Sequence, residues 1–198
     1  MAKILAQKGS DKKATISRKA ASLFRKHGFA QTSMRSLGEH LGVEASSLYN
    51  HIGSKNELLQ NICFKVANDF MKAWESVDQL PDSIIKKLEK LIRFHIHKML
   101  TDYDEVYVSN HEWKQLQEPY LSNFLHQRRL YEKRLIELVG MGIQTKELKK
   151  MDAGVAVFTI LSAVRGLELW HSTKNQLTTN QLADQLVDQL LFGLVKKQ

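Results

Sequence analysis

The sequence has only one cysteine and two prolines in 198 residues. A single cysteine, Cys63, excludes an intramolecular disulfide and a cysteine-based zinc site, and this favours the cytoplasm as the compartment. Pro81 and Pro119 both lie at breaks between long stretches of helical periodicity, because proline cannot continue a helix. The scarcity of both residues predicts long helices without covalent cross-links.

Long apolar runs and export signals are also missing. The most apolar uncharged stretch, 153–164, is well short of the roughly 20 residues that span a bilayer. Residues 1–13 contain no continuous apolar segment and no small-residue cleavage site. We therefore expect a cytoplasmic protein with no membrane partner.

Apolar residues recur at helical spacing over most of the chain. No stretch alternates between apolar and polar residues with a period of two, so the fold class is predicted to be all-α. The segment 152–171 is apolar nearly all round, and such a helix needs a partner surface. Together with the leucine-rich segment 180–196, it is expected to form a four-helix interface in a homodimer.

Positive charge is concentrated near the N-terminus. Residues 1–60 carry ten basic and four acidic side chains, a net charge of +6 out of +8 for the whole chain. Clustered lysine and arginine indicate a polyanionic partner, because they neutralise phosphates and release counterions. Composition alone does not separate DNA from RNA or from an anionic membrane.

The N-terminal segment has the pattern of two short helices joined by a glycine turn. A first helix over 14–24 is followed by Gly28, a residue that stops helices cheaply. Hydroxyl caps at positions 32 and 33 begin a short helix that ends at Gly42, and a second short helix begins near Ala45. This is the helix-turn-helix pattern, in which the second helix enters the major groove of DNA.

The residues of this segment resemble a known family. The run A-x-x-L-F-x-x-x-G-F-x-x-T-S-M-R-S-L, followed by G-V-E-A-S-S-L-Y-N-H-I-G-S-K-N-E-L, is similar to the DNA-binding domain of the TetR family of bacterial repressors over about residues 12–60. Gly38, Glu44 and Ile52 depart from the family's usual alanine, serine and phenylalanine. The resemblance implies a homodimeric, ligand-inducible repressor, with a three-helix reader over 1–54 and a larger helical domain for effector binding and dimerisation over 55–198.

The outward positions of the second short helix carry small or hydrogen-bonding side chains, as groove contacts require. The resemblance implies phosphate contacts from Thr32, Tyr49, His51 and Lys55, and base contacts from Arg35, Ser46, Ser47 and Asn50. Arg35 is either a base contact or a solvated arginine. The predicted partner is double-stranded operator DNA, contacted through Thr32, Ser33, Arg35, Ser46, Ser47, Tyr49, Asn50, His51 and Lys55.

Polar or aromatic residues that fall on apolar helical faces are candidates for an effector pocket. We predict effector contacts from His95, Tyr107, Trp113, Phe124, Arg128, Phe158, Arg165 and Trp170, with Tyr103 and Tyr131 as further candidates. Arg128 and Arg165, if they point inward, need an anionic partner, which favours a mostly apolar effector with an acidic end, such as an acyl or aromatic acid. The alternative is that both arginines reach solvent.

Enzymatic motifs are absent. A di-iron bundle needs Glu-x-x-His on two helices, and the sequence has this spacing once, from Glu168 to His171. No glycine-rich phosphate loop or nucleophile elbow occurs. We expect no catalytic residue, no metal and no cofactor. A non-inducible architectural DNA-binding protein is the alternative, although it has no need of the nearly neutral remainder of the chain.

Overall fold

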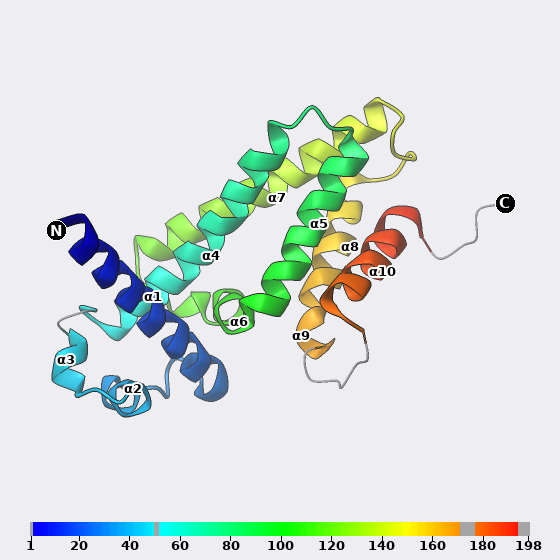
Figure 1. Cartoon of the computed structure of the whole chain (residues 1–198). Helices are drawn as coiled ribbons and strands as arrows, with labels where there is room; N and C mark the ends of the chain where they lie inside the picture. Colours follow the sequence, from blue (N-terminus) through cyan, green and yellow to red (C-terminus); the bar gives the residue numbers. More distant parts are fainter. Residues whose placement is uncertain (1, 50–51, 171–176, 194–198) are drawn as a thin grey trace. The chain divides into compact units, whose positions relative to one another are not determined.

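The computed structural model describes residues 2–49, 52–170 and 177–193, and every regular element in these ranges is a helix (Figure 1). The predicted all-α fold class is confirmed. The chain divides into two compact units. Unit 1 consists of residues 1–67 and 104–125, and unit 2 consists of residues 68–103 and 126–198.

Unit 1 begins with a long helix, α1 (Ala2–His27), which starts well before the predicted segment 14–24. Gly28 ends it with a φ of +81°, a left-handed conformation that glycine adopts at low cost. The Gly28 N–H donates to the Phe24 carbonyl at 2.8 Å.

Two short helices follow, α2 (Met34–Leu41) and α3 (Ala45–Tyr49). The Ser33 hydroxyl accepts from the Ser36 N–H, and the Ser36 hydroxyl accepts from the Ser33 N–H, both at 3.0 Å. This reciprocal cap satisfies two backbone donors at the start of α2. Gly42, with a φ of +67°, closes α2 and turns the chain toward α3. The predicted helix-turn-helix is confirmed.

The rest of unit 1 comes from four further elements: the start of α4 (Lys55–Asp78), α6 (Tyr103–His111), the 3-10 helix η1 (Trp113–Gln115) and the start of α7 (Tyr120–Gln144). Val108, Leu116 and Phe124 share one buried core with the helix-turn-helix. Ion pairs join Arg25 to Asp104 and Lys65 to Glu105. The functional division at residue 54 stays a prediction. By packing, residues 104–125 belong to the same compact unit as the reader.

Unit 2 is organised around α5. It contains α5 (Ile84–Thr101), α8 (Ala153–Arg165), α9 (Leu167–Trp170), α10 (Thr179–Phe192) and the remaining parts of α4 and α7. Helix α5 contacts α8, α9 and α10, and Figure 1 shows it beside α8 and α10. The core includes Trp74, Leu91, Tyr131, Leu138 and Val157.

An ion-pair network fixes α5 against α4 within unit 2. Lys98 Nζ donates to Asp69 Oδ2 at 2.6 Å and to Asp102 Oδ2 at 2.5 Å. Burial acts to lower the pKa of Lys98, but the two carboxylates outweigh it and the pKa is raised. The lysine therefore stays charged at neutral pH and holds the two helices together.

Candidate DNA-binding surface and effector cavity

Buried leucines orient the two short helices of the reader. Leu37 of α2 and Leu48 of α3 are fully buried, and Ile52 just beyond α3 is 3% exposed. Leu48 thus occupies the inward position of α3, and the other two side chains of this helix that the structure describes are those of Ser46 and Tyr49. Ser46 is exposed, and 53% of Tyr49 is exposed. Tyr49 is thus not a core aromatic.

The predicted DNA contacts other than Lys55 fall into three groups. Ser33, Arg35, Ser46 and Tyr49 are exposed. Thr32 is buried, and its hydroxyl donates to the Gly28 carbonyl at 2.8 Å. Asn50, His51 and the side chain of Ser47 lie outside the described residues.

Lys55, at the start of α4, stabilises the loop between α1 and α2. Its Nζ donates to the carbonyls of Phe29 and Thr32, at 2.9 and 2.8 Å, and lies 4.3 Å from the centroid of the Phe29 ring. The charge therefore satisfies carbonyls of the loop between α1 and α2. Any phosphate contact of Lys55 is additional to this role.

Arg35 is paired on the surface of α2. Its Nε lies 3.0 Å from Glu39 Oε1, and the two side chains are 85% and 66% exposed. An exposed pair at this spacing contributes about 0.3–0.5 kcal/mol. The pairing is weak enough for Arg35 to exchange Glu39 for a base or a phosphate.

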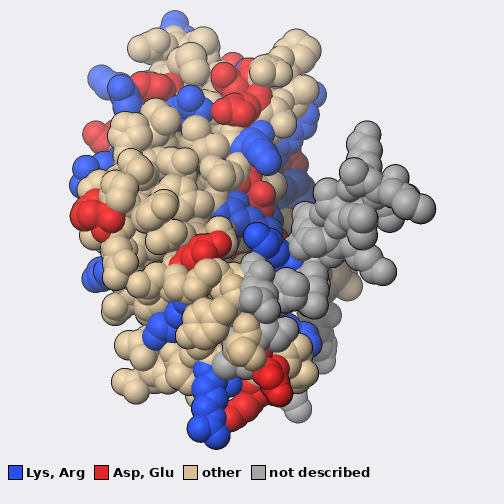
Figure 2. Space-filling model, turned by 90° about the vertical axis from the view of Figure 1, so that its left-hand side faces the viewer, with Lys and Arg blue, Asp and Glu red and all other residues tan. Residues whose placement is uncertain are grey.

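Surface charge is mixed on one face of the molecule. On the face drawn in Figure 2, basic and acidic side chains are interspersed among other residues. The lysine and arginine side chains do not form one continuous patch on that face. The DNA-binding hypothesis consequently rests on the exposed side chains of α2 and α3 and only secondarily on net charge.

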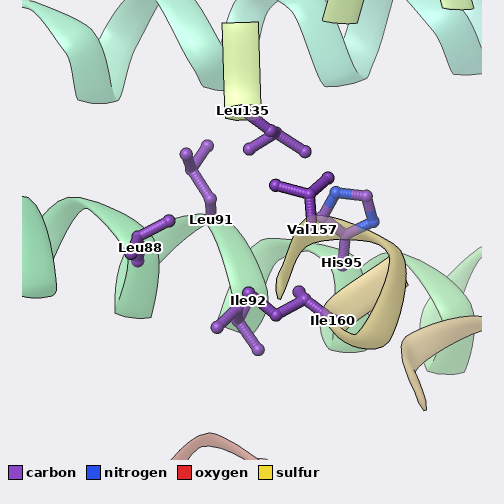
Figure 3. A pocket seen from close by; sticks show the side chains of 7 residues that line it. All are labelled: Leu88, Leu91, Ile92, His95, Leu135, Val157 and Ile160. Atoms are coloured by element: carbon purple, nitrogen blue, oxygen red, sulfur yellow. The ribbon is translucent and has the colours of Figure 1, made fainter. Parts of the chain in front are cut away.

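Unit 2 contains a small apolar cavity of about 10 Å³ between α5, α7 and α8 (Figure 3). This is close to the smallest volume that holds one water molecule. An effector can enter only if the surrounding side chains move. The cavity is lined by His95 and by six aliphatic residues, Leu88, Leu91, Ile92, Leu135, Val157 and Ile160.

His95 is the polar member of this lining. Its Nε2 lies 2.8 Å from the Tyr131 hydroxyl, and its ring centroid lies 4.5 Å from that of Phe70. Burial, and after it the positive charge of Arg165, lowers the pKa of His95 to about 3. The imidazole is therefore neutral at physiological pH.

The predicted effector residues are distributed over both units. Tyr107, which stacks on His111 at 4.3 Å between centroids, belongs to unit 1, as do half-buried Trp113 and fully buried Phe124. In unit 2, Arg128 is half-buried, Arg165 is exposed and 70% of Phe158 is exposed. Trp170 lines a separate open groove between α9 and α10. Of the eight residues, the cavity is lined by His95 alone.

The aliphatic lining was missed by sequence reasoning, which searched for polar or aromatic interruptions. A leucine that borders a cavity has the same helical spacing as a leucine that fills the core. No signal in the sequence distinguishes the two.

Helix α8 exposes an unusually apolar face. Val155 is 62% exposed and Phe158 is 70% exposed, and Phe192 at the end of α10 is 47% exposed. The window Ala153–Trp170 has a mean hydropathy of 1.4, meets the length criterion for a membrane helix and is 22% buried. Large exposed apolar faces mark interaction surfaces. Helix α8 itself ends at Arg165 and has 13 residues, fewer than the roughly 20 that span a bilayer.

Metal-ligating side chains do not assemble in the part of the chain that the structure describes. No group of three or more histidine, cysteine, aspartate or glutamate residues comes together there in a geometry suited to a metal ion.

The buried histidine leads to a prediction about acid stability. The unfolded chain binds a proton at His95 below about pH 6.5, whereas the folded chain does so only near pH 3. The free energy of unfolding therefore decreases as the pH falls below 6.5, by up to about 1.4 kcal/mol per pH unit. Urea unfolding between pH 6.5 and 4.5 should show this slope, and a His95→Gln variant should show a shallower one. An equal change from His126→Gln, at an exposed position, would contradict the assignment.

These features define an all-helical protein in which one unit contains a helix-turn-helix and a second unit contains a small apolar cavity. Residues 16–62 match the family model for bacterial regulatory proteins of the tetR family, and residues 81–194 match the model for the tetracyclin repressor-like C-terminal domain. The chain belongs to the TetR family of transcriptional regulators, which bind DNA and are not enzymes. The resemblance inferred from the sequence is confirmed.

Distant relatives share the fold over nearly the whole chain. The transcriptional repressor KstR2 of Mycobacterium tuberculosis (strain CDC 1551 / Oshkosh) is 18% identical over 180 residues, which is 90% of each chain. The crystal structure of PfmR from Thermus thermophilus has a TM-score of 0.81 at 23% identity, covering 91% of this chain and 99% of that one. AibR, crystallised with isovaleryl coenzyme A and operator DNA, has a TM-score of 0.78 at 24% identity, with coverages of 90% and 97%.

Proposed function

We propose that the protein is a cytoplasmic, homodimeric repressor that binds a pseudo-palindromic operator and releases it when a small apolar or acyl effector enters unit 2. The observation that carries this proposal is the combination, in one TetR-family chain, of a rigidly supported helix-turn-helix and a unit with an apolar cavity. The relatives support it, because KstR2 is a repressor and AibR binds both an acyl thioester and operator DNA.

The exposed residues of the reader have different roles in this proposal. Tyr49 contacts a phosphate through its hydroxyl, and Arg35 and Ser46 reach base edges. Thr32 and Lys55 shape the loop that precedes α2 through their bonds to backbone carbonyls. The contacts implied by the family resemblance are retained for three further residues: base contacts for Ser47 and Asn50, and a phosphate contact for His51.

The proposed effector is mostly apolar and carries one acidic group. The aliphatic lining of the cavity suits the apolar part. Arg165 is the positive charge that contributes to the low pKa of His95, so an anionic group has a partner at the surface of α8. The half-buried Arg128 on α7 is a second candidate.

The proposed dimer covers the apolar face of α8 and the adjoining part of α10 with a second copy of the chain. Phe158 becomes an interface residue instead of an effector contact. Leu186 and Leu190 of α10 are half-buried in one chain and complete the surface. Two helices from each copy make a four-helix interface.

Operator binding in the presence of effectors is the direct test. Fluorescence titrations of genomic fragments should show sequence-specific binding that weakens as the salt concentration rises. Acyl compounds should lower operator affinity about 5- to 150-fold, the usual range for allosteric coupling. Equal binding to all sequences with no effect of any compound would instead indicate an architectural DNA-binding protein.

Two substitutions in the reader should separate phosphate contact from base contact. Tyr49→Phe should weaken binding to operator and to random DNA alike, because a phosphate contact carries no sequence information. Arg35→Ala should cost about 1–3 kcal/mol on operator and much less on random DNA. Arg129→Ala, at an exposed arginine on α7, is the matched control and should change neither. A uniform loss from Arg35→Ala would show that Arg35 contacts a phosphate.

A further inference from the structure

The core of unit 2 contains a hydrogen-bonded polar pair beside its cavity. His95 and Tyr131 are 9% and 8% exposed, and their bond joins α5 to α7. Aromatic rings surround the pair: the Phe70 centroid lies 5.7 Å from that of Tyr131, and the Trp74 centroid lies 6.5 Å from it. The pair thus lies at the boundary between an aromatic cluster and an aliphatic cavity.

Both members of the pair are uncharged at neutral pH. Burial raises the pKa of Tyr131 above its ordinary value, just as it lowers the pKa of His95. A neutral imidazole has one donor and one acceptor nitrogen, and a phenol has one donor and acceptor lone pairs. The bond between the two side chains uses one of their two donor hydrogens. The pair therefore keeps one donor that can form a hydrogen bond with another uncharged group.

A second polar group lies near Tyr131 on α7. Gln127 is one turn before Tyr131 and therefore on the same face of the helix. Its Nε2 lies 3.5 Å from Asn68 Oδ1, whereas its Oε1 is buried and has no hydrogen-bond partner among the described residues. Buried polar atoms are nearly always paired. The Gln127 oxygen is therefore a further polar position one turn from Tyr131, although Gln127 does not line the cavity.

We propose that His95 and Tyr131 recognise the neutral carbonyl oxygen of an acyl derivative or ketone whose aliphatic chain occupies the cavity beside them. The inference rests on the proposed function, in which unit 2 takes up the effector, and it specifies which chemical form of the effector binds. The aliphatic chain of the ligand enters by displacing side chains that line the cavity, among them Leu91, Leu135 and Val157 (Figure 3).

The lining discriminates against a free carboxylate at this position. A buried carboxylate needs a counter-charge, and the lining residues supply none. A carbonyl oxygen needs only one donor, which a neutral imidazole or phenol provides. The acidic group of the effector then belongs to the alcohol or thiol portion of the molecule, outside the cavity and near exposed Arg165.

Three small probes of equal chain length test the inference on the full-length protein at pH 7. Calorimetric titration should show that methyl hexanoate and 2-heptanone bind at least about tenfold more tightly than hexanoate. Tyr131→Phe removes one hydroxyl and keeps the ring, and it should lower the affinity for the first two probes by about tenfold, the equivalent of one hydrogen bond. The ring nitrogens of His95 should also shift in ¹⁵N NMR spectra when either neutral probe binds.

Tyr120→Phe is the matched control, because this tyrosine is 43% exposed and belongs to unit 1. It should leave all three affinities unchanged. Equal binding of hexanoate and methyl hexanoate, an unchanged affinity in Tyr131→Phe, or failure of all three probes to bind would overturn the inference. Release of operator by some other compound would then still support the proposed function. Conversely, if the probes bind as expected but no acyl compound, with or without an acidic group, affects operator binding, the proposed function would be overturned and the carbonyl site would stand.

Discussion

Replacing Phe158 by glutamate is expected to convert the proposed dimer into monomers and to abolish operator binding. Phe158 is 70% exposed on α8, and Val155, one turn earlier, is 62% exposed. In the proposed dimer both pack against a second copy. Two-fold symmetry brings two carboxylates into the interface, and each unpaired buried charge costs about 3–5 kcal/mol. The dimer dissociation constant should therefore rise by at least about a hundredfold.

Sedimentation velocity over a range of concentrations measures this change, and a DNA titration measures its consequence. Met141→Glu is the matched control, because Met141 is an exposed apolar residue on α7, 44% exposed, outside the proposed interface. It should stay dimeric. A Phe158→Glu protein that is as dimeric as the parent would exclude α8 from the interface. Removing α10 is a less direct test, because Leu182 and Val187 are buried in unit 2 and their loss would also destabilise the fold.

Replacing Phe124 by alanine is expected to cause a large loss in the free energy of unfolding. Phe124 is 1% exposed in the core of unit 1, and its ring lies 5.9 Å from that of Phe64. Removing a fully buried phenylalanine leaves a cavity and costs about 3–5 kcal/mol. Phe124→Ala should lower the melting temperature by about 10 °C. Because this core also supports α2 and α3, operator affinity should fall as well.

Tyr120→Ala is the appropriate comparison for Phe124→Ala. Tyr120 begins the same helix and contacts the same Phe64 ring at 6.2 Å, but it is 43% exposed. Its truncation should cost less than about 1 kcal/mol. Thermal unfolding followed by circular dichroism measures both variants. If Phe124→Ala changed effector affinity while leaving the melting temperature intact, Phe124 would be an effector contact, as the sequence suggested.

The helix-turn-helix was predictable from sequence because its determinants are local. Gly28 and Gly42 stop two helices in left-handed conformations, and Ser33 caps the helix between them. Leu37 and Leu48 mark the inward faces of α2 and α3 by their spacing alone. Each of these signals acts within a few residues of chain. The family resemblance drew on the same residues.

The proposed effector cavity was not predictable in this way. Phe124 and Phe158 give the same signal in the sequence, because each is an aromatic residue on an apolar helical stretch. The structure buries Phe124 in the core of unit 1 and leaves Phe158 exposed on α8. Helical periodicity identifies an apolar face, but it does not say which surface covers that face.

The sequence by itself determined the helical class, the reader and the family, because capping, helix termination and apolar spacing depend on neighbouring residues. Only the tertiary structure decided that Lys55 is bonded to the carbonyls of Phe29 and Thr32, and that His95 meets Tyr131 beside a cavity. These contacts join residues 23 to 36 positions apart. Their formation depends on how whole helices pack, and the free energy of that packing is spread over many side chains with no local sequence pattern.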